Sequence, residues 1–587
     1  MSGGALSATA TRLRPRWQIP AGIALRAGTR APGIAAALLA LRGYGDPTER
    51  STFLNPALHS LADPALLADL PRAIARLKAA HARDERITIW GDYDVDGLTS
   101  TALLVRAFAG MGFRAAPHIP HRARDGYGLN TPGIERLADT GTTLIVAVDC
   151  GISNRKEIAH AATRGVDVIV LDHHTIPPDM PDAVAIINPR RADCPYPFKE
   201  LAAVGLAHAL VRALTREGFA LCGAWDDDEP DLLDLLELVA LGTVADVAPL
   251  RGENRVVVTW GLDSLRHTPH PGLQALYAVA GLDPQRLSAW EIGHVLGPRL
   301  NAAGRLGDAD LALRLLLAES PEEALPLAQA LDAINRERQR ELARIMDEAV
   351  ARVEESGALA DDQPIIQIDG AGWTAGVVGL VASRLAERYG RPAIVLERGA
   401  ETSKGSGRSI DGFDLMEALT VCGDLLTHYG GHARAAGLTI ANDDLAALHE
   451  RLLVRARTVL SGTDLRPTLT PDLDLALVDL GYPLTEAFAT LEPFGNGNPE
   501  PLLLLRDIGV KWPKTSGDGK HLFFTAAAQG GAAVRAPLRC VAFGQGERRG
   551  ELQEPGGRFD LLGTLRRESW QGEERLSFHL KDFRMAE

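Results

Sequence analysis

The sequence predicts an α/β protein with two α/β domains, a long helix between them and a small β-barrel at the C-terminal end. Three observations support this fold class. Apolar runs alternate with amphipathic stretches from about residue 86, which is the rhythm of a parallel sheet with helical crossovers. Apolar residues at helical spacing line one face of residues 321–355, opposite a charged face. Short β-prone runs separated by turns fill the chain beyond residue 465.

Length and composition agree with several domains of a soluble protein. The 587 residues exceed what one hydrophobic core can organise, and 46% apolar with 24% charged residues is ordinary for globular proteins. The apolar runs are too short to span a bilayer, and five scattered cysteines form no CxxC pair. We therefore expect a cytoplasmic protein without membrane contact. The net charge of −14 does not exclude nucleic acid, because binding depends on local patches.

The first α/β domain is expected at residues 81–320, after an N-terminal helical region at residues 1–80. Its sheet is predicted from four apolar, β-branched runs, at residues 87–90, 143–148, 166–171 and 184–187. Helices are predicted between these runs, at residues 99–108 and 154–163. A leucine-rich helical region follows, from about residue 201 to residue 317.

A connector helix at residues 321–356 is expected to lead into the second α/β domain, at residues 357–464. A coiled coil is the alternative for this helix, but its apolar stripe is short and interrupted. The barrel is expected at residues 465–587. Its strands are predicted from five short runs, at residues 502–505, 521–524, 538–543, 559–562 and 577–580.

The segment GDYDVDG at residues 91–97 directly follows the first predicted strand. Its three carboxylates, Asp92, Asp94 and Asp96, converge only if they share one face or the turn folds them together. Converging carboxylates repel one another unless protons or cations intervene, and hard divalent cations are the usual answer. The alternative is an acidic turn with solvated aspartates.

Further acidic and imidazole side chains occupy three other predicted strand ends or turns. Asp149 directly follows the run at residues 143–148, Asp172-His173-His174 directly follows the run at 166–171, and Asp246 follows a predicted helix. The carboxyl ends of parallel strands meet at one edge of a sheet, so these groups can share a pocket. Mixed aspartate and histidine ligands suit Mn²⁺ or Mg²⁺, with Zn²⁺ possible. Several carboxylates, one able to bridge, suit the two-ion sites that hydrolyse phosphodiesters. Helix-capping aspartates and a surface histidine pair are the alternative.

These motifs resemble those of a known family. GDYDVDG together with DHH at residues 172–174 resembles the DHH phosphoesterase superfamily. ALGTVADVAPL at 240–250 and GPRLNAAGR at 297–305 are similar to motifs of its RecJ family of single-strand-specific 5′→3′ exonucleases. GGHARAAG at 430–437 resembles the signature of that family's DHHA1 domain, and LEPFGNGNP at 491–499 resembles the start of its OB-fold domain. The resemblance spans nearly the whole chain. It implies a DHH-type parallel sheet, a smaller DHHA1-type domain and an OB-fold.

The resemblance also implies a site with two ions, Mn²⁺ or Mg²⁺. The implied metal ligands, with Asp149 as the bridge, are Asp94, Asp96, Asp149, His173 and Asp246. Asp92 and His174 are implied as catalytic residues that bind or support the ions, with His174 facing the scissile phosphate.

Arginines and small residues are candidates for binding the nucleic acid, because guanidinium groups match phosphate oxygens in bidentate geometry. Taken singly, each is more often a surface cation. The candidates are Arg122, Arg299, Asn301, Arg305, Ser406, Arg408 and His432. With the resemblance, Arg408, His432 and one of Arg122 or Arg124 are implied as contacts to the sugar–phosphate backbone and the 5′ end. The lysines and aromatic residues near Trp512 suit an OB-fold that stacks bases, although lysines also protect sheet edges.

The chain departs from the family pattern at two places. Thr374, in WTAG at residues 373–376, stands where the family usually has histidine, which bears on substrate contacts or rate. LAAVG at residues 201–205 has alanines where a Cys-Gly pair is common, and we interpret this difference as packing.

We therefore expect a metal-dependent exonuclease that degrades single-stranded DNA from its 5′ end to mononucleotides, in DNA repair and recombination. A narrow passage between the two α/β domains would exclude duplex DNA. A monomer is expected, and the resemblance implies a single-stranded-DNA-binding protein and a recombination helicase as partners. One alternative is a phosphodiesterase for nanoRNA or a cyclic dinucleotide, but the barrel favours a longer polymer. A non-catalytic DNA-binding scaffold is the other, and the complete aspartate–histidine set argues against it.

Overall fold

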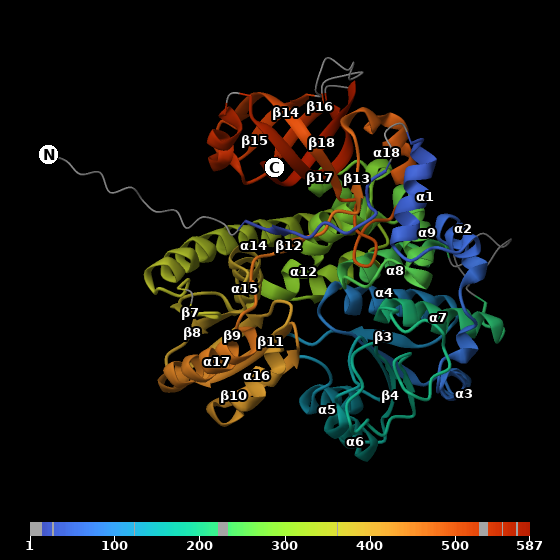
Figure 1. The fold of residues 1–587 in the computed structure, drawn as a ribbon. Coiled ribbons are helices and arrows are strands. Elements are labelled where there is room, and N and C mark those ends of the chain that lie inside the picture. The colour runs from blue at the N-terminus through green and yellow to red at the C-terminus, as the bar shows by residue number, and fades with distance from the viewer. Residues whose placement is uncertain are drawn as a thin grey trace. The chain divides into compact units, whose positions relative to one another are not determined.

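The computed structural model describes residues 14–25, 29–122, 124–220, 233–360, 362–527, 538–554, 556–570 and 573–586 (Figure 1). The chain divides into two compact units. The first unit comprises Leu39–Arg336 and Phe488–Glu500. The second comprises Met1–Leu38, Glu337–Ala487 and Pro501–Glu587. The segment resembling the start of an OB-fold domain, residues 491–499, thus lies within the first unit and not with the barrel.

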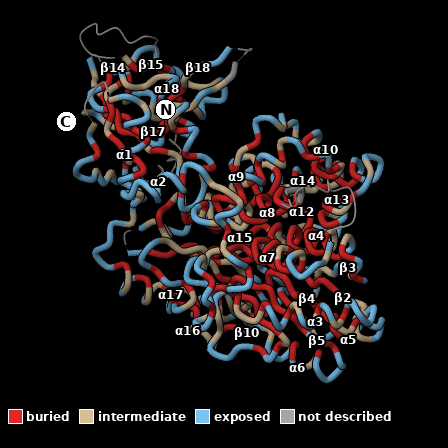
Figure 2. The backbone as a smooth tube through the Cα atoms, turned by 90° about the vertical axis from the view of Figure 1, so that its right-hand side faces the viewer, coloured by how far each residue is buried: buried red, intermediate tan, exposed pale blue. Residues whose placement is uncertain are grey.

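The first unit contains a five-stranded sheet of order β3-β2-β4-β5-β6, in which every neighbouring pair is parallel. Buried, β-branched residues fill its central strands, as expected for a sheet covered on both faces (Figure 2). The strands are β2 (Arg86–Trp90), β3 (Ala115–His118), β4 (Thr142–Val148), β5 (Asp167–Leu171) and β6 (Ala185–Ile187). Four of the five are predicted by the sequence. The apolar pattern misses β3, whose sequence AAPH is short and contains proline.

Helices connect these strands and form the rest of the first unit. The crossover helices are α4 (Val95–Gly110), α5 (Thr131–Asp139) and α6 (Arg155–Thr163). The leucine-rich region is helical, as predicted, and contains α7 (Ala203–Arg216), α8 (Leu233–Ala245), α9 (Gly252–His267), α10 (Pro271–Ala280), α12 (Gly297–Leu306) and α13 (Asp310–Leu317). A π-helical turn, Ile292–Leu296, immediately precedes α12. Before the sheet come α2 (Pro47–Leu54) and α3 (Leu70–Ala82).

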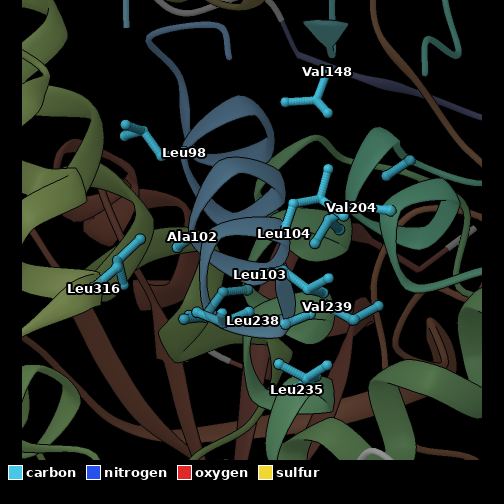
Figure 3. Close-up of a cluster of buried hydrophobic side chains, with 14 of the residues drawn as sticks. Leu98, Ala102, Leu103, Leu104, Val148, Val204, Leu235, Leu238, Val239 and Leu316 are labelled. Atoms are coloured by element: carbon cyan, nitrogen blue, oxygen red, sulfur yellow. The ribbon is translucent and has the colours of Figure 1, made fainter. Parts of the chain in front are cut away.

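A buried leucine and valine cluster fixes α4 against α7 and α8 (Figure 3). Leu103 and Leu104 of α4 meet Val204 of α7 and Leu238 of α8, and all four are fully buried. Burial of each such side chain contributes about 1.5–3 kcal/mol. This packing holds the N-terminal ends of α4 and α7 together, next to the carboxyl edge of the sheet.

The predicted long helix is confirmed as α14 (Pro321–Glu355), and the boundary between the two units falls inside it, after Arg336. The second unit contains a five-stranded sheet of order β10-β11-β9-β8-β7. Only β7 and β8 pair in parallel within this sheet. The strands are β7 (Ile366–Ala371), β8 (Ala393–Arg398), β9 (Thr402–Arg408), β10 (Leu426–His432) and β11 (Ala435–Ala441), and the helices are α15 (Ala375–Tyr389), α16 (Leu415–Val421) and α17 (Leu445–Leu460).

The C-terminal strands form the predicted barrel. The sheet order is β13-β14-β15-β16-β18-β17, and an additional pairing of β14 with β17 closes it. Closure removes exposed strand edges. The strands are β13 (Leu473–Asp474), β14 (Leu503–Thr515), β15 (Leu522–Ala527), β16 (Leu538–Ala542), β17 (Arg558–Trp570) and β18 (Glu573–Met585).

Two smaller findings concern the cysteines and the membrane. Cys150, Cys194, Cys422 and Cys540 are free and buried, and Cys222 lies outside the described residues. Among the helices that the structure describes, none has the length and apolar character needed to cross a membrane.

Candidate metal centre

The turn after β2 brings the three carboxylates of GDYDVDG together. Asp94 is the N-cap of α4, and its side chain accepts hydrogen bonds from the backbone N–H groups of Asp96 (3.0 Å) and Gly97 (3.2 Å). Gly97 is required for this turn, because a Cβ there would lie 2.5 Å from the Asp92 carbonyl oxygen. Strand β2 ends at Trp90, so the alternating side-chain directions of a strand do not apply to the three aspartates that follow it.

Asp96 is fully buried and held from two sides. Its carboxylate accepts hydrogen bonds from the backbone N–H groups of Ala203 (2.8 Å) and Val204 (2.9 Å), at the start of α7. On α8, a Cβ at Gly242 would lie 3.1 Å from Asp96 Oδ1, so glycine allows the close approach. Ala203 and Val204 of LAAVG thus support a predicted metal ligand through main-chain groups, which any residue type except proline supplies.

Asp149 follows β4 directly and adopts a φ of 61°, in the left-handed region that non-glycine residues rarely occupy. Such conformations persist where surrounding contacts hold them, often at functional sites. The hydroxyl of Tyr127 provides one such contact, since it donates to the Asp149 carbonyl oxygen at 2.9 Å.

Asp172 follows β5 and orients His174. It accepts hydrogen bonds from the backbone N–H groups of Ile152 and His174, both at 3.0 Å, and its Oδ1 lies 2.7 Å from His174 Nδ1. Burial lowers the pKa of His174, but the hydrogen bond and charge of Asp172 outweigh it, so the net shift is upward. Burial raises the pKa of Asp172, and its bonds to His174 reverse that shift.

The ligand atoms of seven side chains form three overlapping groups, and within each group they lie within 4.8 Å of one another. Asp149 and His173 each belong to two groups, and His173 Nε2 lies 3.2 Å from Asp149 Oδ1. The groups are Asp92, Asp94 and Asp149; Asp96, His173 and Asp246; and Asp149, His173 and His174. This overlap suits two cations that share ligands.

Electrostatics also indicate a cation site. Burial, reinforced by neighbouring carboxylates, raises the pKa of Asp92 and Asp149 well above the usual range, that of Asp96 to about 7 and that of Asp246 to about 9. The Oδ1 atoms of Asp92 and Asp149 are buried and make no hydrogen bond with the described residues. Carboxylate oxygens and imidazole nitrogens are donors that Mn²⁺ and Mg²⁺ accept, so the residues present fit those ions.

The structure thus brings together all five predicted ligands and both predicted catalytic residues. Asp92 is only 4% exposed and belongs to the same group as Asp94 and Asp149, so its carboxylate is as well placed to bind a cation as theirs are. Individual roles for these residues remain predictions.

The predicted arginines of the first unit differ in their surroundings. The Arg122 guanidinium lies 5.0 Å from the centre of the Tyr93 ring, and its charge opposes the upward pKa shift of Asp92. Arg124 is largely exposed and pairs with Asp125 at 3.2 Å. Of these two arginines, Arg122 is therefore the one whose charge reaches the cluster.

Helix α12 approaches the turn after β2 through Gly304, where a Cβ would lie 2.8 Å from the Tyr93 carbonyl oxygen. This packing brings α12, which carries the predicted contacts Asn301 and Arg305, to the turn; the Arg305 charge opposes the upward pKa shift of Tyr93. The Arg299 guanidinium is already engaged within the protein, because it donates to Asp332 of α14 (3.0 Å) and to the Val295 carbonyl oxygen (2.8 Å).

The predicted contacts of the second unit share one sheet. His432 of β10 pairs with Ala435 of β11, which pairs with Arg408 of β9, so the three side chains share a face. Arg408 donates to Ser406 Oγ at 2.9 Å. On α15, a Cβ at Gly379 would lie 3.0 Å from that Oγ, so glycine again permits the approach.

Thr374 is the N-cap residue of α15. Its hydroxyl donates to Glu341 of α14 at 2.9 Å. The residue that departs from the family pattern therefore connects α15 to the second half of α14.

Tyr127 is the functional candidate that sequence reasoning missed. Its Oη also lies 3.3 Å from His174 Nδ1. Tyr127→Phe should lower kcat about 10-fold, as expected for loss of a residue that supports a predicted metal ligand, because the ring remains while the bond to Asp149 is lost. Steady-state kinetics on a single-stranded oligonucleotide would check this.

Tyr277→Phe is the matched control, because its hydroxyl also donates to a main-chain carbonyl in the first unit, that of Leu265, at 3.0 Å. Equal kcat values for wild type and Tyr127→Phe would contradict the assignment.

A parallel sheet with aspartates and a histidine pair at its carboxyl edge defines a DHH-type phosphoesterase. The model for the DHH family, N-terminal domain, matches residues 86–243, that for the DHHA1 domain matches 362–457, and that for the RecJ OB domain matches 471–582. The chain belongs to the RecJ family of single-stranded-DNA-specific exonucleases.

Relatives that match most of the chain support this assignment. The chain is 37% identical to the single-stranded-DNA-specific exonuclease RecJ of Bacillus subtilis, over 94% of the chain and 68% of the relative. It is 39% identical to RecJ of Dickeya dadantii, over 80% of the chain and 83% of the relative. The crystal structure of RecJ from Thermus thermophilus in complex with Mn²⁺ is similar over 98% of the chain and 80% of that protein, with a TM-score of 0.80 and 31% identity.

Proposed function

We propose that the cluster of Asp92, Asp94, Asp96, Asp149, His173, His174 and Asp246 binds two divalent cations and hydrolyses single-stranded DNA from its 5′ end, releasing mononucleotides. The chain is a metal-dependent exonuclease for single-stranded DNA, as its family is. The observation that carries the proposal is the overlap of three ligand groups through Asp149 and His173.

Bound at this cluster, the ions would supply an activated water and neutralise charge on the phosphoryl group. The chain's residues hold the geometry for that chemistry. Asp94 and Asp96 are fixed by backbone N–H groups, and the backbone of Asp149 is held by the Tyr127 hydroxyl. Because His174 Nδ1 lies against Asp172, we assign to Nε2 the contact with the scissile phosphate.

The 5′→3′ direction of degradation would come from residues that bind the 5′ terminus of the strand. Arg408 and Ser406 lie side by side on β9, and His432 shares their sheet. A guanidinium with a neighbouring hydroxyl suits a terminal phosphate, which carries more charge than an internal one. A single strand carrying different labels at its two ends tests this polarity. Early release of the 5′ label supports the proposal, and early release of the 3′ label contradicts it.

Arg408→Ala should lower kcat/KM on a 5′-phosphorylated strand about 10- to 100-fold, because a hydrogen bond to a charged group contributes about 1.5–3 kcal/mol. The dependence on Mn²⁺ concentration should stay unchanged. Comparing 5′-phosphate and 5′-hydroxyl strands isolates the effect, since the loss should shrink on the latter.

Arg398→Ala is the matched control, because this arginine lies on the neighbouring strand β8 and pairs with Asp369 at 3.2 Å. An equal loss for Arg408→Ala on both strand types would contradict a contact to the terminal phosphate.

The wider setting rests on the family alone. We include in the proposal a role in DNA repair and recombination, a cytoplasmic monomer, and partnership with a single-stranded-DNA-binding protein and a recombination helicase. The closed barrel supports a polymeric substrate over a cyclic dinucleotide.

A further inference from the structure

The turn that follows α8 and Asp246 places Val247 in an unfavourable backbone conformation. Val247 N–H donates to the Val244 carbonyl oxygen and Ala248 N–H to that of Thr243, both at 3.1 Å, which is the hydrogen-bond pattern of a Schellman motif. In that motif Val247 occupies the position that glycine normally fills, with a φ of 59°. A β-branched residue is disfavoured there, and Val247 is 64% exposed, so burial does not compensate.

A segment distant in the sequence holds this turn. The Asn496 side-chain amide donates to the Val247 carbonyl oxygen at 2.8 Å. The Asn496 carbonyl oxygen accepts from Leu250 N–H at 2.7 Å. One residue thus bonds both ends of the turn that follows Asp246.

The segment around Asn496 is itself rigidly built. The buried side chain of Asn498 donates to the carbonyl oxygens of Leu491 (2.8 Å) and Pro493 (2.9 Å). Arg255 of α9, also buried, donates to the carbonyl oxygens of Leu491 (3.0 Å) and Glu492 (2.7 Å). The segment is therefore fixed to the helix that leads away from the turn.

Glycines mark where the two segments touch. A Cβ at Gly495 would lie 2.7 Å from Leu250, and one at Gly497 would lie 2.9 Å from Pro249. The two glycines allow the close approach to Pro249 and Leu250, and Asn496 between them makes the hydrogen bonds. This explains the sequence GNG in this segment, which lies outside the barrel.

We infer that Phe488–Glu500, although it lies between barrel strands β13 and β14 in the sequence, supports the metal centre, and that Asn496 is a positioning residue for Asp246. The inference rests on the proposed role of Asp246 as a metal ligand. Asn496 acts through the backbone of Val247, which would otherwise relax and move the carboxylate away from His173 and Asp96.

The test measures Mn²⁺ binding to the metal-free full-length chain by titration calorimetry and by electron paramagnetic resonance. Asn496→Ala should weaken one of the two Mn²⁺ sites about 10-fold and leave the other unchanged. Adding Val247→Gly should restore binding, because glycine adopts the left-handed conformation without support. Asn496→Asp should weaken binding in the same way, since it keeps the main-chain bond to Leu250 but removes the donor.

Asn442→Ala is the matched control, because its side-chain amide also donates to main-chain carbonyl oxygens, those of Gly399 and Ala400, but in the second unit. Wild-type Mn²⁺ binding by Asn496→Ala would overturn the inference, as would failure of Val247→Gly to restore a weakened site. Asp246→Asn distinguishes failure of the proposed ligand set from failure of the positioning role of Asn496. If it retains both Mn²⁺ sites, the proposed ligand set is wrong; if it loses one while Asn496→Ala loses none, only the positioning role is wrong.

Discussion

Replacement of Asp149 by asparagine should lower kcat about 1,000-fold and leave the protein folded. Asp149 belongs to two of the three ligand groups, and an amide cannot bridge two cations as a carboxylate does. Metal-based stabilisation of the transition state is worth several kcal/mol, and each 1.36 kcal/mol is a factor of about ten in rate. The melting temperature of the metal-free variant should equal or exceed that of the wild type, because asparagine replaces a buried carboxyl group whose ionisation burial and the neighbouring carboxylates disfavour.

Steady-state assays on a single-stranded oligonucleotide with Mn²⁺, and circular dichroism melts without metal, measure both effects. Asp179→Asn is the control, because this carboxylate is exposed and pairs with Arg155 at 3.4 Å. If Asp149→Asn keeps more than a tenth of the wild-type kcat, the bridging role is wrong. If the variant unfolds in the absence of metal, burial of the Asp149 carboxyl group does not carry the expected electrostatic cost.

The metal-free protein should lose stability as the pH rises from about 4 to 9. Burial raises the pKa of Asp96 to about 7 and that of Asp246 to about 9, from 3.8 in the unfolded chain. The folded state therefore binds these protons more tightly than the unfolded state does. Their contribution to stability is complete below about pH 4 and disappears as the pH passes the raised values. The expected loss is on the order of a few kcal/mol.

Urea denaturation of the metal-free chain at pH 5, 7 and 9 measures this loss. Saturating Mn²⁺ should abolish it, because the cations replace the protons. The double variant Asp96→Asn with Asp246→Asn should reduce the pH dependence in the absence of metal, and Asp92 and Asp149, whose pKa values are also raised, should carry the remainder. A free energy of unfolding that stays constant or rises from pH 5 to pH 9 would contradict the electrostatic account of the cluster.

Residues that act through their side chains at strand ends could be predicted from the sequence. The apolar runs locate β2, β4 and β5, and in a parallel sheet their carboxyl ends bring Asp94, Asp149 and His173 together. The same reasoning missed β3, whose short AAPH sequence lacks an apolar pattern. It also shortened the barrel strands: β17 and β18 each have 13 residues, and the apolar runs mark only part of their buried residues.

Contacts that depend on main-chain groups or distant partners could not be predicted. Ala203 supports Asp96 through its backbone N–H group, and Tyr127 and Asn496 donate to main-chain carbonyl oxygens. The sequence pattern carries no signal for such bonds. The charge of Arg299 suggests a nucleic-acid contact, but its partner Asp332, 33 positions along the chain, becomes visible only in the fold. Side-chain chemistry therefore predicts which aspartates and histidines come together better than it predicts the main-chain contacts that hold them.

The central claim is that two cations share one cluster through Asp149. Crystals of the full-length chain grown with Mn²⁺, with diffraction measured at the manganese absorption edge, test it most directly. We expect two anomalous peaks that both contact Asp149, one beside Asp92 and Asp94 and the other beside Asp96, His173 and Asp246. A single peak, or two peaks of which neither contacts Asp149, would contradict it.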